Sequence, residues 1–174
     1  MPILNPLWSC AVLLTIAVGT PSVFAQAAAK RQATPPPAEL EQCIVSAAEF
    51  HSVNPAVLRA ILKVESNLNP SAFGRNQNGT VDIGIGQVNS MHLPKLAQHG
   101  VTVAHLYDGC SAAYVSGWHL KSVIDANGNT LQGIAAYHSK TPYFNQRYQI
   151  LLSNELVRSG VIVGTLRPVP PLYP

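Results

Sequence analysis

Apolar residues recur every three or four positions from about Ala38 to Gly160, which is the spacing of buried helix faces. The first such stretch, Pro37–His51, is predicted to be a helix that buries one face. That face carries Leu40, Ile44, Ala47 and Ala48. No alternating run is long enough to predict a strand, except around Val81–Val88. The pattern therefore predicts a mainly α domain with a short β or loop segment around residues 76–90.

Polar and proline residues mark where further helices begin. Asn54 is a favourable N-cap and Pro55 suits a first helical turn, so a second helix is predicted to run to Ser66. Ser111 and Thr130 are the N-caps that we predict for two later helices. The later helices are predicted at Ser111–Ala126, Thr130–Tyr137 and Tyr143–Arg158. In the first of these, Tyr114, Val115 and Trp118 share a face that we expect to be core.

The second helix places a carboxyl group where an apolar residue is expected. Glu65 continues the face formed by Leu58, Ile61 and Leu62, so its side chain is predicted to point inward. It also lies near the helix C-terminus, where the macrodipole disfavours an anion by about 0.3 to 1 kcal/mol. Burial and the dipole both raise the pKa of a carboxyl group, as a general acid working near neutral pH requires.

An ordinary surface role for Glu65 is the alternative. The side chain would then be exposed at the helix end, or it would form a surface ion pair with Arg59 or Lys63. On this residue alone the two interpretations stay open.

The two ends of the chain differ from its middle. Residues 1–25 are interpreted as a signal peptide, because the apolar run Ala11–Val18 is too short to span a bilayer and Val23–Ala25 fits a cleavage site. An uncleaved membrane anchor is the alternative. Residues 26–37 are predicted to be a flexible linker, residues 38–160 the folded domain, and residues 161–174 a proline-rich tail. That tail would bind a partner or simply fray.

Export would leave two cysteines, Cys43 and Cys110, in an oxidising compartment. We expect them to form a disulfide, with two buried free thiols as the alternative. A disulfide closing a loop of this length restricts the unfolded chain by about 4 kcal/mol in the entropy model.

Composition narrows the possible functions of this 174-residue chain. Hydrophobic residues make up 47% and charged residues 11%, and the net charge is only +3, which is too small and dispersed for a nucleic-acid binder. The six histidines form no His-x-x-x-His pair and the cysteines no Cys-x-x-Cys pair, so no metal site is predicted. By contrast, the glycine- and amide-rich segment Asn76–Ser90 suits the hydroxyl and acetamido groups of a neutral polar ligand.

Three blocks of this sequence resemble the signature of soluble lytic transglycosylases. They are Val64–Pro70, Asn78–Ser90 and Ala135–His138. The resemblance spans roughly Glu41–Leu152 and is closest to the small exported members that serve type III and type IV secretion, conjugation and pilus assembly. It implies a lysozyme-like α+β domain in the periplasm of a Gram-negative bacterium. The implied substrate is the glycan strand of peptidoglycan, with no cofactor. We expect a monomer whose tails contact components of such a machine.

The resemblance also implies roles for individual residues. Glu65 would be the essential acid that cleaves the β-1,4 bond between N-acetylmuramic acid and N-acetylglucosamine and then helps form a 1,6-anhydro product. Gln87 and Asn89 would border the sugar, and Ser66 would also belong to the substrate-binding set. Tyr137, in the third block, would lie near Glu65 and hold or tune it.

Asp82 leaves the reaction type open. The run from Asp82 to Ser90 also resembles that of c-type lysozymes, in which a second carboxylate supports hydrolysis with retention. Asp82 would therefore stabilise an oxocarbenium-like state, act as a nucleophile, or cap a turn. The alternatives to a transglycosylase are a lysozyme-like hydrolase that uses Glu65 and Asp82, and a non-catalytic peptidoglycan-binding assembly factor.

Overall fold

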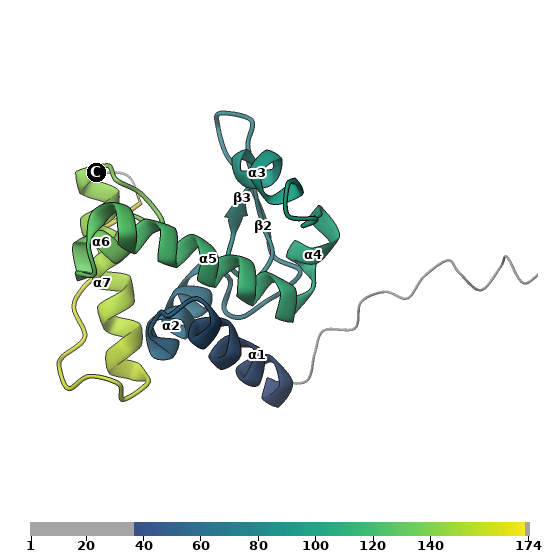
Figure 1. Ribbon diagram of the computed structural model, residues 1–174. Coiled ribbons are helices and arrows are strands. Elements are labelled where there is room, and N and C mark those ends of the chain that lie inside the picture. Colours follow the sequence, from purple (N-terminus) through teal and green to yellow (C-terminus); the bar gives the residue numbers. More distant parts are fainter. Residues whose placement is uncertain (1–36, 173–174) are drawn as a thin grey trace, which may run out of the picture. The chain divides into compact units, whose positions relative to one another are not determined.

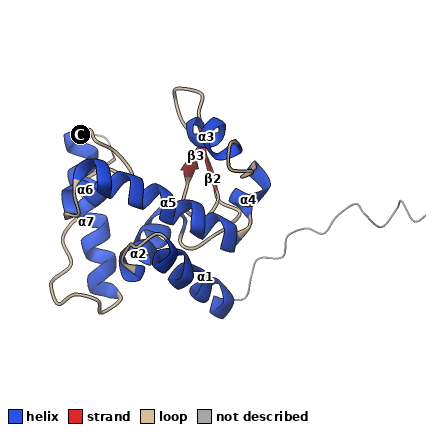
Figure 2. Cartoon of the chain, in the orientation of Figure 1, coloured by secondary structure: helices blue, strands red, loops and turns tan. Residues whose placement is uncertain are grey.

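The computed structural model describes residues 37–172, in which helices dominate and three short strands form one sheet (Figures 1 and 2). The mainly α fold predicted from the sequence is confirmed. The predicted leader and all but the last residue of the predicted linker lie outside the described residues. In chain order the elements are α1 (Pro37–Phe50), α2 (Pro55–Ser66), β1 (Phe73–Arg75), β2 (Val81–Ile83), β3 (Val88–Asn89), a 3-10 turn (Ser90–His92), α3 (Leu93–Ala97), α4 (Val103–Tyr107), α5 (Gly109–Asn127), α6 (Leu131–Ala135) and α7 (Pro142–Arg158).

The larger of two hydrophobic cores lies among α1, α2, α5, α6 and α7. The predicted face of α1 is buried there, with Ile44, Ala47 and Ala48 fully buried and Leu40 nearly so. Asn54 caps α2 as predicted, because its side chain accepts the N–H groups of Ala56 and Val57. The helix α5 runs across the molecule below the sheet in this view, from α4 to α6, so it contacts both halves of the described domain (Figure 1).

Two expectations about α5 are wrong in detail. The helix begins at Gly109, and its N-cap is Asp108 rather than Ser111, whose N–H the Asp108 side chain accepts at 2.8 Å. Tyr114 is not a core residue, since it is 36% exposed and lies edge-on to Phe50. Val115, on the same predicted face, is buried.

The sheet is antiparallel with strand order β1-β2-β3. The single strand suspected around Val81–Val88 is in fact two strands joined by the turn at residues 84–87. In this register Asp82 lies opposite Gly74 on one side and Asn89 on the other. The second hydrophobic core lies between this sheet and the helices α3, α4 and α5, and it contains Ile83, Val88, Leu96, Leu106 and Val115.

A disulfide joins Cys43 in α1 to Cys110 at the start of α5, with the two Cα atoms 5.1 Å apart. The predicted pairing is therefore present. It ties the first described helix to α5, which contacts both cores.

The proline-rich segment after α7 lies against that helix and is not frayed over residues 161–172. Asn154, which is buried, accepts the N–H of Arg167 and donates to its carbonyl oxygen, both at 2.8 Å. Nearer the end, Arg147 donates to the carbonyl oxygen of Pro170 and Tyr143 to that of Pro171. We call residues 161–172 the C-terminal strap. Within the described part of the chain, no helix has the length and apolar character needed to cross a membrane.

Candidate active site

Glu65 lies in the last turn of α2, on the face that carries the buried residues Leu58, Ile61 and Leu62. The helix ends at Ser66, and Asn67 adopts the left-handed conformation that terminates it. The inward orientation predicted for Glu65 is therefore present. The alternative surface pair with Arg59 is not, because Arg59 binds Glu41 at 2.9 Å instead.

The partner of Glu65 is a tyrosine in the last helix. The hydroxyl group of Tyr148 donates a hydrogen bond to Oε1 of Glu65 at 2.6 Å, a length typical of a charge-assisted bond. Tyr148 itself is almost fully buried in the larger core. The carboxyl group is thus fixed between α2 and α7.

This environment shifts the acid strength of Glu65 strongly. Burial is the main cause that raises the pKa of Glu65 to about 7, against the opposing effect of the hydrogen bond from Tyr148 and with a smaller contribution from the negative charge of Asp82. A carboxyl group with a pKa near 7 holds its proton at neutral pH and can also release it. It therefore fits a group that donates and then accepts a proton.

Asp82 is the second carboxylate near the site. Both of its oxygens accept side-chain amide hydrogen bonds, Oδ2 from Asn76 at 2.9 Å and Oδ1 from Asn89 at 2.7 Å. Asn89 and Asn76 also donate to Thr80. The bonds hold Asp82 in the sheet and satisfy one lone pair on each carboxylate oxygen.

Two glycines bring the turn at residues 84–87 close to the helices. Gly84 has a φ of +72°, and a Cβ there would collide with the carbonyl group of Leu106. At Gly86 a Cβ would collide with Ser116 in α5. The absence of a side chain at both positions therefore allows this close approach.

The predicted substrate-binding side chains of this region all have partners within the protein. Ser66 donates to the carbonyl oxygen of Ile85 at 2.7 Å, and Gln87 donates to that of Gly84 at 2.9 Å. Asn89 bonds Asp82, as described above. The bond from Ser66 fixes the turn against the end of α2, while the bonds of Gln87 and Asn89 lie within the turn and the sheet.

Tyr137 joins the third sequence block to the turn. Its buried hydroxyl group donates to the carbonyl oxygen of Gly86 at 2.9 Å. Tyr137 therefore holds the turn, whereas Tyr148 bonds the acid. Both tyrosine hydroxyls have raised pKa values because of burial and the nearby Glu65, so both stay protonated and act as donors.

Sequence analysis missed Tyr148. A weak signal was present, since Tyr148 lies one turn before Leu152 on the inner face of the last helix, and a buried tyrosine hydroxyl needs a partner. The imidazole ring of His138, next to Tyr137, stacks on the ring of Tyr148 with centroids 4.8 Å apart. Burial, followed by the cation of Arg147, lowers the pKa of His138, which favours a neutral ring against Tyr148.

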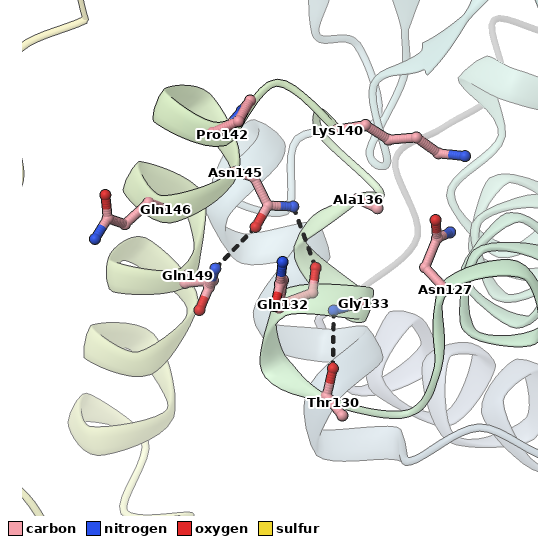
Figure 3. Close-up of a pocket in the computed structure, with 10 residues that line it drawn as sticks. All are labelled: Asn127, Thr130, Gln132, Gly133, Ala136, Lys140, Pro142, Asn145, Gln146 and Gln149. Carbon is pink, nitrogen blue, oxygen red and sulfur yellow. Dashed lines mark hydrogen bonds between the residues drawn. The ribbon is translucent and has the colours of Figure 1, made fainter.

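A polar hollow of about 630 Å³ is lined by Ala136 and Lys140, which flank Tyr137 in the sequence (Figure 3). It is bounded by the end of α5, by α6 and by the start of α7. Its side chains are mainly amides with one ammonium group, and Asn145 at its base bonds Gln149 and the carbonyl oxygen of Gln132. The lining residues are Asn127, Thr130, Gln132, Gly133, Ala136, Lys140, Pro142, Asn145, Gln146 and Gln149. It does not include Glu65.

Comparison with known families gives one match that covers more than half of the chain. Residues 42–147 match the profile of the Transglycosylase SLT domain. The chain belongs to this family. All three sequence blocks and Glu65 lie inside the matched range of this SLT domain, whereas Tyr148 follows it directly.

Individual relatives of this SLT domain protein come from enteric bacteria. Invasion protein IagB of Salmonella typhimurium is 29% identical over 100 residues, which cover 57% of this chain and 62% of IagB. An X polypeptide of Escherichia coli is 30% identical over 124 residues, covering 69% of this chain and 73% of the relative. Protein IpgF of Shigella flexneri is 26% identical over 117 residues, covering 67% of this chain and 77% of IpgF. The match thus spans less than two thirds of IagB.

Proposed function

We propose that this protein is a peptidoglycan lytic transglycosylase that cleaves the β-1,4 bond between N-acetylmuramic acid and N-acetylglucosamine. The observation that carries the proposal is the carboxyl group of Glu65, which Tyr148 bonds at 2.6 Å and whose pKa is raised to about 7, in a chain of the SLT family. A carboxyl group held in this way suits the single acid and base that the reaction needs.

In the proposed reaction Glu65 acts twice. Its proton moves to the glycosidic oxygen while the bond from that oxygen to the anomeric carbon breaks. The resulting carboxylate then accepts the proton of the muramoyl C6 hydroxyl group, whose oxygen bonds the anomeric carbon and forms the 1,6-anhydro ring. No water is consumed, and Glu65 ends in its starting protonation state. The hydroxyl group of Tyr148 donates to Glu65, and this bond stabilises the Glu65 carboxylate between the two proton transfers.

Asp82 supports this reaction as a fixed negative charge. An oxocarbenium-like transition state carries positive charge, which a nearby carboxylate stabilises. Because both oxygens of Asp82 accept amide hydrogen bonds, the carboxylate suits a stabilising charge better than a nucleophile. A lysozyme-like hydrolase is the second candidate, favoured by the proximity that lets Asp82 raise the pKa of Glu65.

The proposed setting is the periplasm, where the enzyme opens the wall locally for a secretion, conjugation or pilus machine and acts as a monomer. Support comes from the disulfide, which persists in oxidising compartments, and from the relative IagB, which is named an invasion protein. Gln87, Asn89, Ser66 and Tyr137 shape the wall of the glycan site in this proposal. The polar hollow offers amide groups to neighbouring sugar units.

Mass spectrometry of the muropeptides released from purified peptidoglycan tests the reaction. Residues 26–174 with the disulfide formed are compared with the Glu65→Gln and Asp82→Asn variants. We expect anhydro products, one water lighter than hydrolysis products, and we expect Glu65→Gln to abolish them. Reducing ends whose release is lost in Asp82→Asn would instead establish the hydrolase. No release by the unmodified protein, together with wall binding, would indicate an assembly factor.

A further inference from the structure

The start of the C-terminal strap exposes apolar side chains to solvent. Val163 is fully exposed, and its neighbours are about half exposed. We define the apolar tip as Val161, Ile162, Val163 and Leu166. Several exposed apolar side chains gathered on one loop, on a domain with cores of its own, indicate a contact surface.

Backbone hydrogen bonds anchor the loop that carries the apolar tip at both of its ends. The N–H groups of Val161 and Ile162 both donate to the carbonyl oxygen of Leu156 at the end of α7. At the other end of the loop, Asn154 bonds both backbone groups of Arg167. The tip therefore extends from the end of α7 as a fixed loop (Figure 1).

A basic hollow of about 560 Å³ lies directly beside the apolar tip, and Val161 lines both. Its lining carries three cations, Arg59, Lys63 and Arg158, and one carboxylate, Glu155. Arg59 is neutralised by Glu41 at 2.9 Å. Arg158 lies 3.9 Å from Glu155, at the limit of an ion pair, and no carboxylate in the described residues pairs with Lys63. The hollow thus keeps a positive charge.

We propose that the apolar tip and the basic hollow together dock this protein on the surface of an anionic lipid bilayer. The two chemistries lie side by side, as phosphate headgroups and acyl chains do at such a surface. The apolar tip would enter the boundary between the lipid headgroups and the acyl chains, while the basic hollow would accept a phosphate group. A second copy of this chain fits poorly, because a two-fold contact would bring the same cations together.

This docking leaves the candidate active site free. Lys63 and Glu65 are two residues apart on α2, and at about 100° per residue their side chains point to nearly opposite sides of the helix. Lys63 lines the basic hollow, whereas Glu65 faces α7 and the sheet. The surface is therefore independent of the catalytic proposal.

Vesicle co-sedimentation tests the proposal with residues 26–174. Vesicles of phosphatidylethanolamine and phosphatidylglycerol are compared with vesicles of phosphatidylcholine alone. The test variants are Val163→Glu, at a fully exposed side chain, and Arg158→Gln. The matched control is Val103→Glu in α4, which introduces the same charge at a residue that is also exposed.

We expect binding to the anionic vesicles, weakened by salt. Arg158→Gln should weaken it roughly fivefold and Val163→Glu at least as much, while Val103→Glu binds like the unmodified protein. Equal loss for the two glutamate variants would overturn the proposal, as would equal binding to phosphatidylcholine or none to either vesicle. Self-association abolished by Val163→Glu, without vesicle binding, would assign the surface to a second copy.

Discussion

Glu65 makes the folded state sensitive to pH. Its pKa is about 7 in the folded protein against an ordinary value of 4.5, so between these values the folded state holds a proton that the unfolded state has lost. The free energy of unfolding should therefore fall as pH rises from about 4.5 to 7, by up to about 3 kcal/mol from this group.

Urea unfolding at a series of pH values checks this slope. The Glu65→Gln variant lacks this pH-dependent contribution to the free energy of unfolding. It should therefore gain stability relative to the unmodified protein above pH 7. Parallel curves for the two proteins across the window would mean that Glu65 has an ordinary pKa.

Tyr148 should tune the pH dependence of activity. Its hydrogen bond stabilises the carboxylate form of Glu65, so Tyr148→Phe should raise the pKa of Glu65. The loss of kcat/KM above pH 7, where the acid is deprotonated, should then begin at a higher pH. The free energy of unfolding of the variant should also be lower by about 1 to 3 kcal/mol.

A control substitution at a second tyrosine of the same helix separates this effect on the pKa of Glu65 from a general loss of structure. Tyr143 donates to the carbonyl oxygen of Pro171, far from the acid. Tyr143→Phe should leave the pH profile of the glycan cleavage unchanged. If both variants shift the profile equally, the hydrogen bond to Glu65 is not its cause.

Among the elements, α7 connects the site to the C-terminal strap. On one face of α7, Tyr148 bonds Glu65. On another face, Arg147 and Asn154 bond the strap. Asn154→Ala should cost about 1 to 3 kcal/mol of stability, because it leaves both backbone groups of Arg167 without their buried partner. It should also speed proteolysis within residues 161–172.

Thermal unfolding and limited proteolysis measure the two effects. Gln146→Ala, an exposed amide on the same helix, should change stability by less than about 0.5 kcal/mol. Equal protease resistance in Asn154→Ala and Gln146→Ala would show that the amide of Asn154 does not hold the strap.

The elements that sequence analysis predicted correctly are those with local signals. Asn54 and Thr130 cap their helices through bonds to residues two or three positions later, which a sequence displays directly. The five-residue helices α3 and α4 are too short to show a period, and strands of two or three residues depend on their partners. The exposed Tyr114 shows the same limit, because a helical face does not specify what packs on it.

In the candidate site, too, sequence analysis predicted the local features and missed those that depend on long-range packing. The inward position of Glu65 followed from its place in the α2 pattern. Its bond to Tyr148 spans 83 residues and depends on how α7 docks, which no local pattern encodes. The tyrosine selected from the sequence, Tyr137, bonds the turn instead.

At the scale of the whole molecule, the disulfide ties α1 to α5 across 67 residues. Replacing both Cys43 and Cys110 by serine should lower the free energy of unfolding by about 4 kcal/mol in the entropy model. Chemical denaturation with and without a reductant measures this. The reductant should destabilise the unmodified protein and leave the double variant unchanged. Equal stability of all forms would mean that the crosslink does not restrict the unfolded chain.

The separation of 83 positions between Glu65 and Tyr148 also sets when the candidate site is assembled. While the chain is still unfolded, Glu65 is an ordinary exposed carboxylate with no tyrosine beside it. The site is complete only after the last helix has docked. If the proposed function holds, the catalytic acid is assembled only in the fully folded protein, so the unfolded chain would have no wall-cleaving activity.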